Sequence, residues 1–592
     1  MVIYQTDFQK ESEATALASD PLIFEFLSTA LNDPSNSLDQ QISLAKLIAE
    51  LAKVDTTRST FNDIPCLIQL LEKGIDIASE DLIINLLRSL ANLCYDYDDN
   101  RDKIYNIPGS IDIILKSFSI NSKIKTIAFH AILNISMDNE LVQAALITGG
   151  VLNQIQIAIQ PLETQIMTSE TNDSIIGLKV LSSVLESDKG LDELFKILQS
   201  TSASMKLMNE HFKSTEIEDA EYDFIIEYMD AVSVVLETIS ENNPAQDLIY
   251  SVKLMDHMID FINIWPDYVP MEQSEINLKT VKIAISKIIT TVTHSDYIMI
   301  EVLKHPSTVS HFINWMEAKD VPSDADLDDD VRMTGALCIG NLARSDESCY
   351  KLVYDHHIVS PLVKLLKVES ERLKSDSIER TESKHLIRVL HAVIGAFKNL
   401  SLAEKVRSEV GELETINTIV SLFELDHLKL IYVACIGIIR NLCAGDNDIN
   451  LYRILSGTNP DQSDLAQMTQ FDPNTTSPVG KIIRLVWNVN DDHDGGIRTE
   501  GGRVIVNIIK AIHKRKALQF LPLLFSLNSI TLVLQTLTGA VLTRSTTSPV
   551  TDFDSDNQVH FDAEPEAARV FPTIQNESIV ALTLLCSSKF LK

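Results

Sequence analysis

Aromatic residues, glycine and proline are scarce in this sequence. Aromatics make up 6% of the 592 residues, with 19 glycines and 18 prolines, whereas hydrophobic residues reach 45%. A β-protein of this size needs more turn residues, and a disordered chain has fewer apolar ones. The composition therefore favours a folded chain built mainly from Leu, Ile, Val and Ala.

Basic residues are few compared with acidic ones. The chain has 50 Lys and Arg against 83 Asp and Glu, a formal net charge of −33. Such a surface repels nucleic-acid phosphates and anionic membranes, and it attracts cationic partners. We therefore expect no nucleic acid among the partners. The alternative is that the acidity serves only solubility.

Targeting and membrane-spanning segments are not apparent. Residues 1–14 lack the basic and apolar regions of a secretory signal. The most apolar stretch, Ala517–Leu542, is interrupted by polar residues and a proline, which favours a buried helix over a membrane span. The seven cysteines form no CxxC pair, as is typical of a reducing compartment. We expect a cytoplasmic location, with the nucleus as a second compartment, and no direct membrane insertion.

Motifs of common catalytic and metal sites are missing as well. The sequence has no glycine-rich phosphate loop, no HExxH or GxSxG motif, and no Cys/His pair at metal spacing. The acidic segment Asp491–Gly496 lacks the alternating oxygens and closing Glu of an EF-hand. We predict a protein that is not an enzyme and needs no cofactor.

A short phrase centred on Asn followed by Leu or Ile recurs along the chain. The asparagines of its five clear copies and of one looser copy are Asn92, Asn134, Asn341, Asn399, Asn441 and Asn507. The intervals 92–134 and 399–441 are both 42 residues, inside the ~40–47 range of armadillo and HEAT repeats and outside the ~33–34 of ankyrin and TPR repeats. Longer intervals contain polar insertions, which solenoids tolerate at repeat junctions.

Apolar spacing predicts the helices within a repeat. Leu82, Leu86 and Leu90 recur on one face of a long helix that carries the Asn. The helix before it begins near Pro65 and ends at Gly74. Equivalent second helices are predicted at 108–118, 150–159, 358–368, 412–425 and 479–489. A short helix, a second helix and a long third helix in this order favour armadillo over HEAT repeats.

We therefore predict an all-α, right-handed superhelical armadillo-repeat solenoid with about ten or eleven repeats. It spans 1–592 as a single domain, with better-defined repeats at 60–150 and 331–456. Acidic or polar loops are predicted at 369–383, 457–496 and 546–573.

The repeated asparagines are candidate binding residues. Third helices of armadillo repeats line a concave groove, and an Asn amide offers donors and an acceptor that complement an extended peptide. Alternatively, each Asn bonds the neighbouring repeat and fixes its geometry. Because one residue type recurs at one helical position, we favour groove recognition. The candidates are Asn92, Asn134, Asn341, Asn399 and Asn441, with Arg344, Lys398 and Arg440 among them.

Acidic clusters follow three of these helices. Their members are Asp96, Asp98, Asp99, Asp346, Asp446 and Asp448. A further run, Asp324–Asp330, precedes the helix that carries Asn341. We predict that these carboxylates form an acidic groove that attracts a Lys/Arg-rich segment of a partner. For the run, a solvated loop is the alternative.

Several stretches resemble one known family. Gly335–Cys349 resembles a repeat of the smg GDP dissociation stimulators (SmgGDS), as do Ala396–Leu402 and Asn576–Leu585. Asn92–Arg101 is more similar to the fungal bud-emergence members of that family, which bind Rho-type GTPases.

The resemblance implies a function. The family binds Rho- and Ras-type small GTPases that end in a polybasic tail and a prenylated cysteine. It chaperones them, and some members stimulate guanine-nucleotide exchange. By this likeness Asn341 and Asn399 would contact the GTPase and the acidic groove would receive the tail. We therefore expect a GTPase chaperone in Rho signalling and cell polarity.

An armadillo scaffold or transport adaptor that binds basic peptides is the alternative. A groove of the importin type pairs its asparagines with tryptophans one turn away. The tryptophans here are Trp265, Trp315 and Trp487, none of them beside a repeated asparagine. We therefore prefer the GTPase-binding function.

Overall fold

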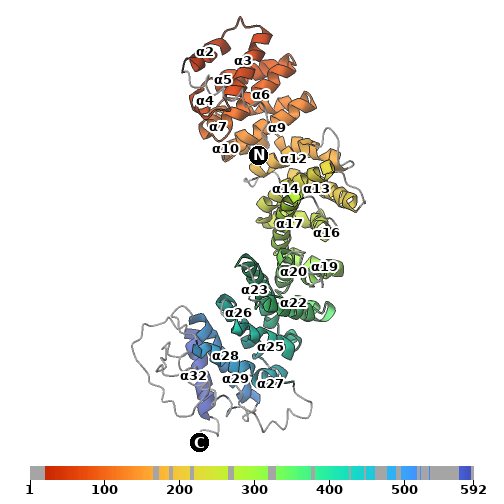
Figure 1. The fold of residues 1–592 in the computed structure, drawn as a ribbon, viewed down its shortest axis with the longest axis vertical. Coiled ribbons are helices and arrows are strands. Elements are labelled where there is room, and N and C mark those ends of the chain that lie inside the picture. The colour runs from red at the N-terminus through yellow and green to blue at the C-terminus, as the bar shows by residue number, and fades with distance from the viewer. Residues whose placement is uncertain are drawn as a thin grey trace, which may run out of the picture. The chain divides into compact units, whose positions relative to one another are not determined.

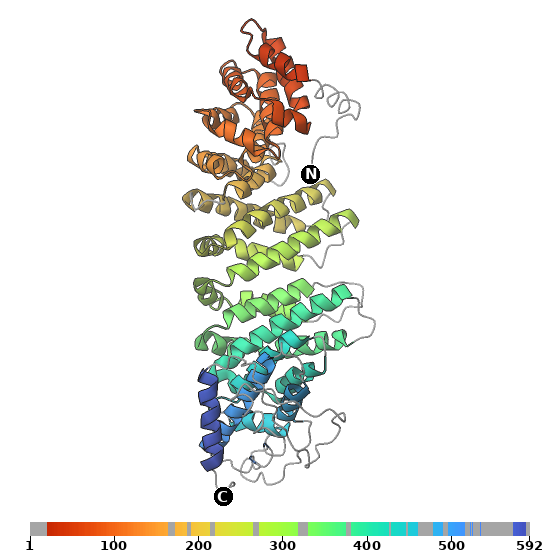
Figure 2. The same ribbon diagram turned by 90° about the vertical axis from the view of Figure 1, so that its left-hand side faces the viewer.

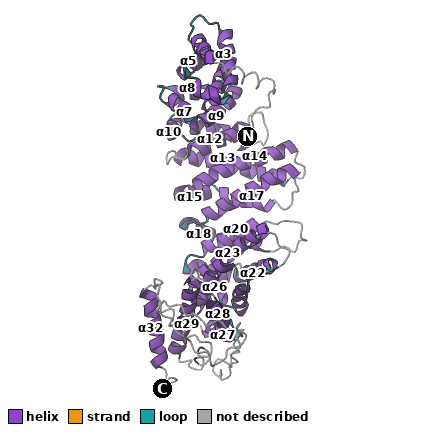
Figure 3. Ribbon diagram, turned by 60° about the vertical axis from the view of Figure 1, so that its left-hand side comes forward, coloured by secondary structure: helices purple, strands orange, loops and turns teal. Residues whose placement is uncertain are grey.

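Helices are the regular elements of the described part of this chain. The computed structural model describes residues 21–163, 172–185, 191–213, 219–264, 272–317, 329–374, 380–425, 428–445, 448–459, 477–488, 495–515, 521, 524, 533 and 572–587. In these residues the assigned regular structure is helical throughout, and Figure 3 shows no strand. The predicted all-helical repeat fold is confirmed.

The chain divides into two compact units, Met1–Ser295 and Asp296–Lys592. Unit 1 contains α2 Pro21–Leu31, α3 Leu38–Leu51, α4 Asp55–Thr60, α5 Ile64–Asp76, α6 Glu80–Cys94, α7 Asp98–Tyr105, α8 Ser110–Lys116, α9 Ser122–Ser136, α10 Glu140–Thr148, α11 Val151–Ile159, α12 Asn172–Val184, α13 Leu191–Phe212, α14 Asp219–Ser240, α15 Asn243–Ser251, α16 Leu254–Ile264 and α17 Glu272–Val292. Each unit is described by itself below.

Unit 2 has the same kind of elements. It contains α18 Asp296–Val302, α19 Pro306–Met316, α20 Asp329–Leu342, α21 Asp346–Tyr350, α22 Val359–Leu373, α23 Arg380–Leu402, α24 Arg407–Val410, α25 Leu413–Ser421, α26 Lys429–Leu442, α27 Asp448–Ser456, α28 Pro478–Asn488, α29 Gly495–Arg515 and α32 Pro572–Ser587. Short 3₁₀ segments include η5 Glu404–Val406, and the π-helical turn η4 Lys351–Asp355 follows α21.

Long third helices pack in series inside each unit. In unit 1 the series is α3, α6, α9, α12, α14 and α17, and in unit 2 it is α20, α23, α26, α29 and α32. Figures 1 and 2 show these helices running side by side. We call the exposed side of each series the third-helix face. The first and second helices of the repeats pack behind it.

The predicted periodicity accounts for the core. Leu82, Leu86, Leu90 and Leu93 are fully buried along one side of α6. Burying each such side chain stabilises the fold by about 1.5–3 kcal/mol relative to exposure. The predicted second helices are present as α8, α11, α22, α25 and α28. Gly150 precedes α11 with a φ of 90°, a conformation that glycine adopts without strain.

Two of the predicted loops are partly wrong. Within 369–383, α22 continues to Leu373 and α23 begins at Arg380. Glu369 is buried and pairs with Arg372, whereas Glu371 is exposed. Within 457–496, residues 478–488 form α28, whose apolar side is buried in the repeat. The loop predicted at 546–573 lies outside the described residues except for its last two positions, which begin α32. Most of the apolar stretch 517–542 also lies outside the described residues.

Among the described residues no single helix is both long and apolar enough to cross a bilayer, and two sharply bent helix pairs meet the criteria by length and composition alone.

Candidate functional site

In unit 1 the repeated asparagines bond the preceding repeat. Asn92 in α6 donates through Nδ2 to the carbonyl oxygen of Ala49 in α3 at 2.9 Å. Asn134 in α9 donates to the carbonyl oxygen of Ala91 in α6, also at 2.9 Å. Both side chains are half-buried. Each amide therefore ties one third helix to the one before it.

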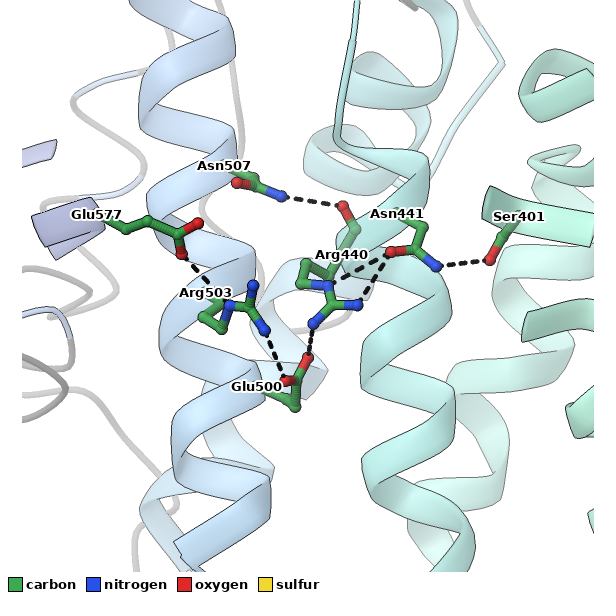
Figure 4. A network of polar contacts seen from close by, with 7 residues as sticks. All are labelled: Ser401, Arg440, Asn441, Glu500, Arg503, Asn507 and Glu577. Carbon is green, nitrogen blue, oxygen red and sulfur yellow. Dashed lines mark hydrogen bonds and ion pairs between the residues drawn. The ribbon is translucent and has the colours of Figure 1, made fainter. Parts of the chain in front are cut away.

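The same arrangement recurs in unit 2. Asn399 donates to the carbonyl oxygen of Gly340 at 2.9 Å, and Asn441 donates to the Ser401 hydroxyl at 2.9 Å. Asn507 extends the series by donating to the carbonyl oxygen of Arg440 at 3.2 Å. Figure 4 shows the last two bonds together. Asn341 lies half-buried at the equivalent position of α20.

These bonds favour the alternative that the sequence left open, in which the asparagines fix the geometry between repeats. A side-chain amide has two N–H donors and an acceptor oxygen, and one donor is already used inside the fold. Our preference for groove recognition therefore has no support from these contacts. Recognition of a partner by the remaining polar atoms stays a prediction.

Sequence reasoning missed a second type of contact between repeats. Arg101, at the fourth position of α7, donates through Nε to the carbonyl oxygens of Cys94 and Asn134 at 3.1 and 3.0 Å. Arg407 similarly donates to the carbonyl oxygens of Ser401 and Ala444 at 2.9 and 3.2 Å. A cation at the C-terminal end of a helix is favourable because unpaired carbonyls carry partial negative charge there. The available signal was an Arg eight or nine residues after the repeated Asn.

Several predicted acidic residues lie at helix junctions of unit 1. Asp96 follows α6, and Asp98 and Asp99 form the first turn of α7; all three side chains are exposed. Asp98 also accepts a hydrogen bond from Arg101 at 2.5 Å. The three carboxylates therefore lie exposed at a helix junction, at the end of a third helix as the sequence indicated, and their part in an acidic groove stays a prediction.

An apolar and acidic pattern repeats at such junctions. Asp96 and Asp138 both have left-handed backbones, with φ of 53° and 52°. The residues before them, Tyr95 and Met137, are 45% and 40% exposed. Leu141, four residues after Met137, is exposed as well. We call the following set the acidic edge: Tyr95, Asp96, Asp98, Asp99, Met137, Asp138, Glu140 and Leu141.

Cations near the acidic edge point into the fold. The side chain of Arg101 is only 3% exposed, and that of Arg58 is 12% exposed. Both guanidinium groups are occupied by backbone carbonyls and by a carboxylate. The outward charge of the edge is therefore strongly negative, and the exposed apolar side chains lie within it.

Only some of the remaining acidic candidates lie in the described part of the chain. Asp346 is exposed in the first turn of α21. Asp446 and the side chain of Asp448 lie outside the described residues. Of the run Asp324–Asp330, only its last two residues are described, and Asp329 pairs with Arg332 and Arg372 at 3.2 and 3.0 Å. That end of the run is neither a free binding edge nor a solvated loop.

Ion pairs across repeats give the third-helix faces a mixed charge. They join residues of consecutive third helices and include Arg88 with Glu50, Lys125 with Asp173, Lys179 with Glu227, Lys287 with Glu237, Arg440 with Glu500 and Arg503 with Glu577. Figure 4 shows the last two pairs. Exposed pairs contribute only about 0–1 kcal/mol each. Their main effect is to neutralise acidic side chains on the third-helix faces, so these faces are not uniformly acidic.

Arg344 and Arg440 are both engaged within unit 2. Arg344 donates to the carbonyl oxygen of Asn341 at 2.8 Å and pairs with Asp296 at 3.2 Å. Arg440 pairs with Glu500 at 2.5 Å and donates to the Asn441 side-chain oxygen at 3.1 Å. Contact of either arginine with a partner stays a prediction.

Glu369, at the end of α22, is a buried carboxylate. Its side chain is fully buried and pairs with Arg332 and Arg372 at 3.0 and 2.7 Å. Burial raises the pKa of Glu369, and the two arginines oppose that rise. The cluster holds the end of α22 against the start of α20.

Comparison with known proteins gives distant relatives. No protein-family model matches the chain. The Drosophila melanogaster "GTPase-GDP dissociation stimulator vimar" is 22% identical over 527 residues, which cover 85% of this chain and 72% of the relative. The Xenopus laevis "Rap1 GTPase-GDP dissociation stimulator 1-B" is 24% identical over 401 residues, 64% of this chain. This chain is a relative of the GTPase-GDP dissociation stimulators.

The resemblance of the repeats to the SmgGDS family is thus confirmed at low identity. The match covers 56% of the Xenopus stimulator, so it spans little more than half of that relative. "Darlin" of Dictyostelium discoideum is 20% identical over 60% of this chain. The special likeness to fungal members stays a prediction.

A solved structure supports the fold alone. An engineered protein aligns with 82% of this chain at a TM-score of 0.52 and 15% identity, and 98% of that protein is covered. At this identity the likeness carries no information on function.

Proposed function

We propose that this relative of the GTPase-GDP dissociation stimulators binds small GTPases of the Rho or Ras type and acts as their chaperone in the cytoplasm. The observation that carries the proposal is the series of relatives named for GDP dissociation from GTPases. The solenoid supplies extended exposed faces suited to protein binding.

The acidic edge of unit 1 is proposed to take the polybasic tail. Its carboxylates Asp96, Asp99 and Asp138 are exposed, and the nearest arginines are turned inward. A Lys/Arg-rich segment would be steered to this edge, and aliphatic parts of its side chains could pack on Tyr95 and Met137. Electrostatic capture of this kind weakens as salt is added.

Binding of a Rho-type GTPase with and without its polybasic tail tests the proposal. Affinity should depend on the tail and should fall when salt rises from about 0.05 to about 0.2 M. The variant Asp96→Asn, Asp99→Asn, Asp138→Asn should bind the tailed GTPase several-fold more weakly. Asn is chosen because it tolerates the left-handed backbone at two of these positions.

A matched control removes equal charge elsewhere in unit 1. Glu72, Asp76 and Asp112 are exposed on α5 and α8, and their Gln or Asn replacements should leave the affinity nearly unchanged. Equal losses in the two variants would contradict tail capture at the edge. Equal affinity for any basic peptide, with no contribution from the folded GTPase, would favour the scaffold or transport adaptor.

Stimulation of nucleotide exchange is a separate part of the proposal. Chaperoning needs binding alone, whereas exchange requires distortion of the nucleotide site. Release of a fluorescent GDP from the GTPase, followed with and without the chain, separates the two activities. Tight binding with unchanged release would leave a chaperone without exchange activity.

A further inference from the structure

Helix α23 carries a row of cations on its exposed side. Lys384, Arg388, His391 and Lys398 are spaced by three, four or seven residues, so they share one face of the helix. The row is about 20 Å long at 1.5 Å per residue. All four side chains are exposed, and α23 has no Asp or Glu from Ser383 to Leu402. We call these four residues the basic row.

The basic row gathers on one helix several cations that are unpaired among the residues described, whereas many cations of the other third helices are paired. Elsewhere, cations such as Lys179 and Arg440 pair with acids of the neighbouring repeat. Within the described part of unit 2, Lys384, His391 and Lys398 have no acidic partner, and Arg388 has a long pair of 3.9 Å with Asp330. In a chain of net charge −33, a face that keeps unneutralised positive charge is unusual. Among the described residues, pairing with carboxylates does not account for it.

Two glycines provide an independent observation at the same surface. Gly395 lies within the row and Gly437 occupies the equivalent position of α26, four residues before the repeated Asn. A Cβ added at either glycine would meet nothing within 4 Å apart from the adjacent residues and the backbone of its own helix. Glycine weakens a helix interior, and its usual justification is a close neighbour. No described neighbour within unit 2 requires these glycines, so the helix backbone is open to close approach at this surface.

We propose that the basic row with Gly395 is a docking surface for a carboxylate-rich face of a folded protein partner. The proposal rests on the proposed function and goes beyond it, because the row has the opposite sign to the acidic edge. The partner is the small GTPase of the proposed function, and the cations of the row would contact an acidic face of its folded domain. Complementary charge of this kind fixes orientation and speeds association.

Charge reversal with a tail-free probe tests the docking surface. The row variant is Lys384→Glu, Arg388→Glu, Lys398→Glu, and the probe is a Rho-type GTPase without its polybasic tail. The control variant is Lys304→Glu, Lys364→Glu, Lys405→Glu, three exposed lysines outside the third-helix face of unit 2. Both variants change the net charge equally. We expect the row variant to bind the probe about tenfold more weakly, chiefly through a slower association rate, and the control to bind nearly as the wild type does.

A second variant adds bulk without charge. Gly395→Tyr has room on the free surface, so the protein should fold with an unchanged melting temperature and lose affinity for the tail-free GTPase. Binding of the isolated tail peptide should be unaffected by Gly395→Tyr and should change equally in the two charge variants.

The outcomes separate the two proposals. If the wild type binds neither the GTPase nor its tail, the proposed function is wrong and this inference falls with it. If the wild type binds the tail-free GTPase and the row variant and Gly395→Tyr bind it equally well, only the docking surface is wrong. Inorganic triphosphate tests whether the row is instead a phosphate-binding site. If the wild type binds triphosphate and the row variant does not, while both bind the GTPase equally well, the inference is wrong.

Discussion

The side-chain amide of Asn399 donates a 2.9 Å hydrogen bond to the carbonyl oxygen of Gly340, which lies 59 residues earlier in the chain. Equivalent bonds leave Asn92 and Asn134 in unit 1. The repeated asparagine is thus a joint between consecutive third helices.

Removing one joint should destabilise the fold. Asn399→Ala deprives the Gly340 carbonyl of its partner, and we expect the free energy of unfolding to fall by about 1–2 kcal/mol. Urea denaturation of the full chain, followed by circular dichroism, measures the change. Lys398→Ala is the control, because its exposed side chain has no polar contact within the described residues. An unchanged unfolding midpoint for Asn399→Ala would mean that Asn399 does not stabilise the fold. The predicted role of Asn399 in partner binding would then be favoured.

Arg101 is expected to matter more than any single asparagine. Its buried guanidinium bonds the carbonyl oxygens of Cys94 and Asn134, so Arg101→Met leaves two helix ends without a cap. We expect a loss of about 2–4 kcal/mol in unfolding free energy. Arg101→Lys should not restore it, since one ammonium lacks the planar fork of donors. The control is Lys103→Met, two residues further along α7, which should lower the unfolding free energy only slightly. Comparable losses of unfolding free energy in Arg101→Met and Lys103→Met would assign the effect to α7 in general.

Glu369 should give unfolding a specific pH dependence. Because burial raises its pKa in the folded state above the ordinary value of 4.5, the folded protein binds this proton more tightly than the unfolded chain. The contribution of Glu369 to stability is therefore greatest below pH 4.5 and declines as pH rises through the folded pKa. Relative to Glu369→Gln, the wild type should lose stability over that rise. A wild type that instead gains on the variant with increasing pH would mean that Arg332 and Arg372 outweigh burial.

Thiol reactivity offers a test of the cores of both units. Burial raises the pKa of Cys94 to about 12 and that of Cys349 to about 11. These thiols stay protonated near pH 8 and should resist a disulfide reagent until the protein is unfolded. Cys586 is exposed on α32 and should react first. Fast modification of Cys94 in the native protein, measured by peptide mass after labelling, would contradict the packing of α6.

The sequence was sufficient to predict the fold because the repeat carries its own markers. Asn92 and Asn134 are 42 residues apart, and the leucines of α6 follow helical spacing, so both the repeat and its buried face were readable. The loop at 369–383 was mispredicted because a polar segment normally faces water. Glu369 is instead neutralised by two arginines inside the fold, and that pairing depends on residues 37 positions apart.

The role of the asparagines could not be read in the same way. An amide complements any backbone carbonyl, whether it belongs to a partner or to the previous repeat, and only the packing distance between α20 and α23 decides between them. The binding role of the acidic clusters stays a prediction. Their place after the third helices was readable from the sequence, whereas the left-handed turns at Asp96 and Asp138 were not.

The double cap formed by Arg101 determines where unit 1 can be cut or spliced. The guanidinium of Arg101, in α7, donates hydrogen bonds to carbonyl oxygens at the ends of α6 and α9. A fragment that includes α6 or α9 without α7 therefore has a helix end whose carbonyl lacks this donor. The smallest transferable block is therefore not a single repeat but the overlapping span Glu80–Ser136. Natural recombination or engineered repeat swaps in this part of the chain should succeed when breakpoints fall outside that span and fail when they fall between α7 and either partner.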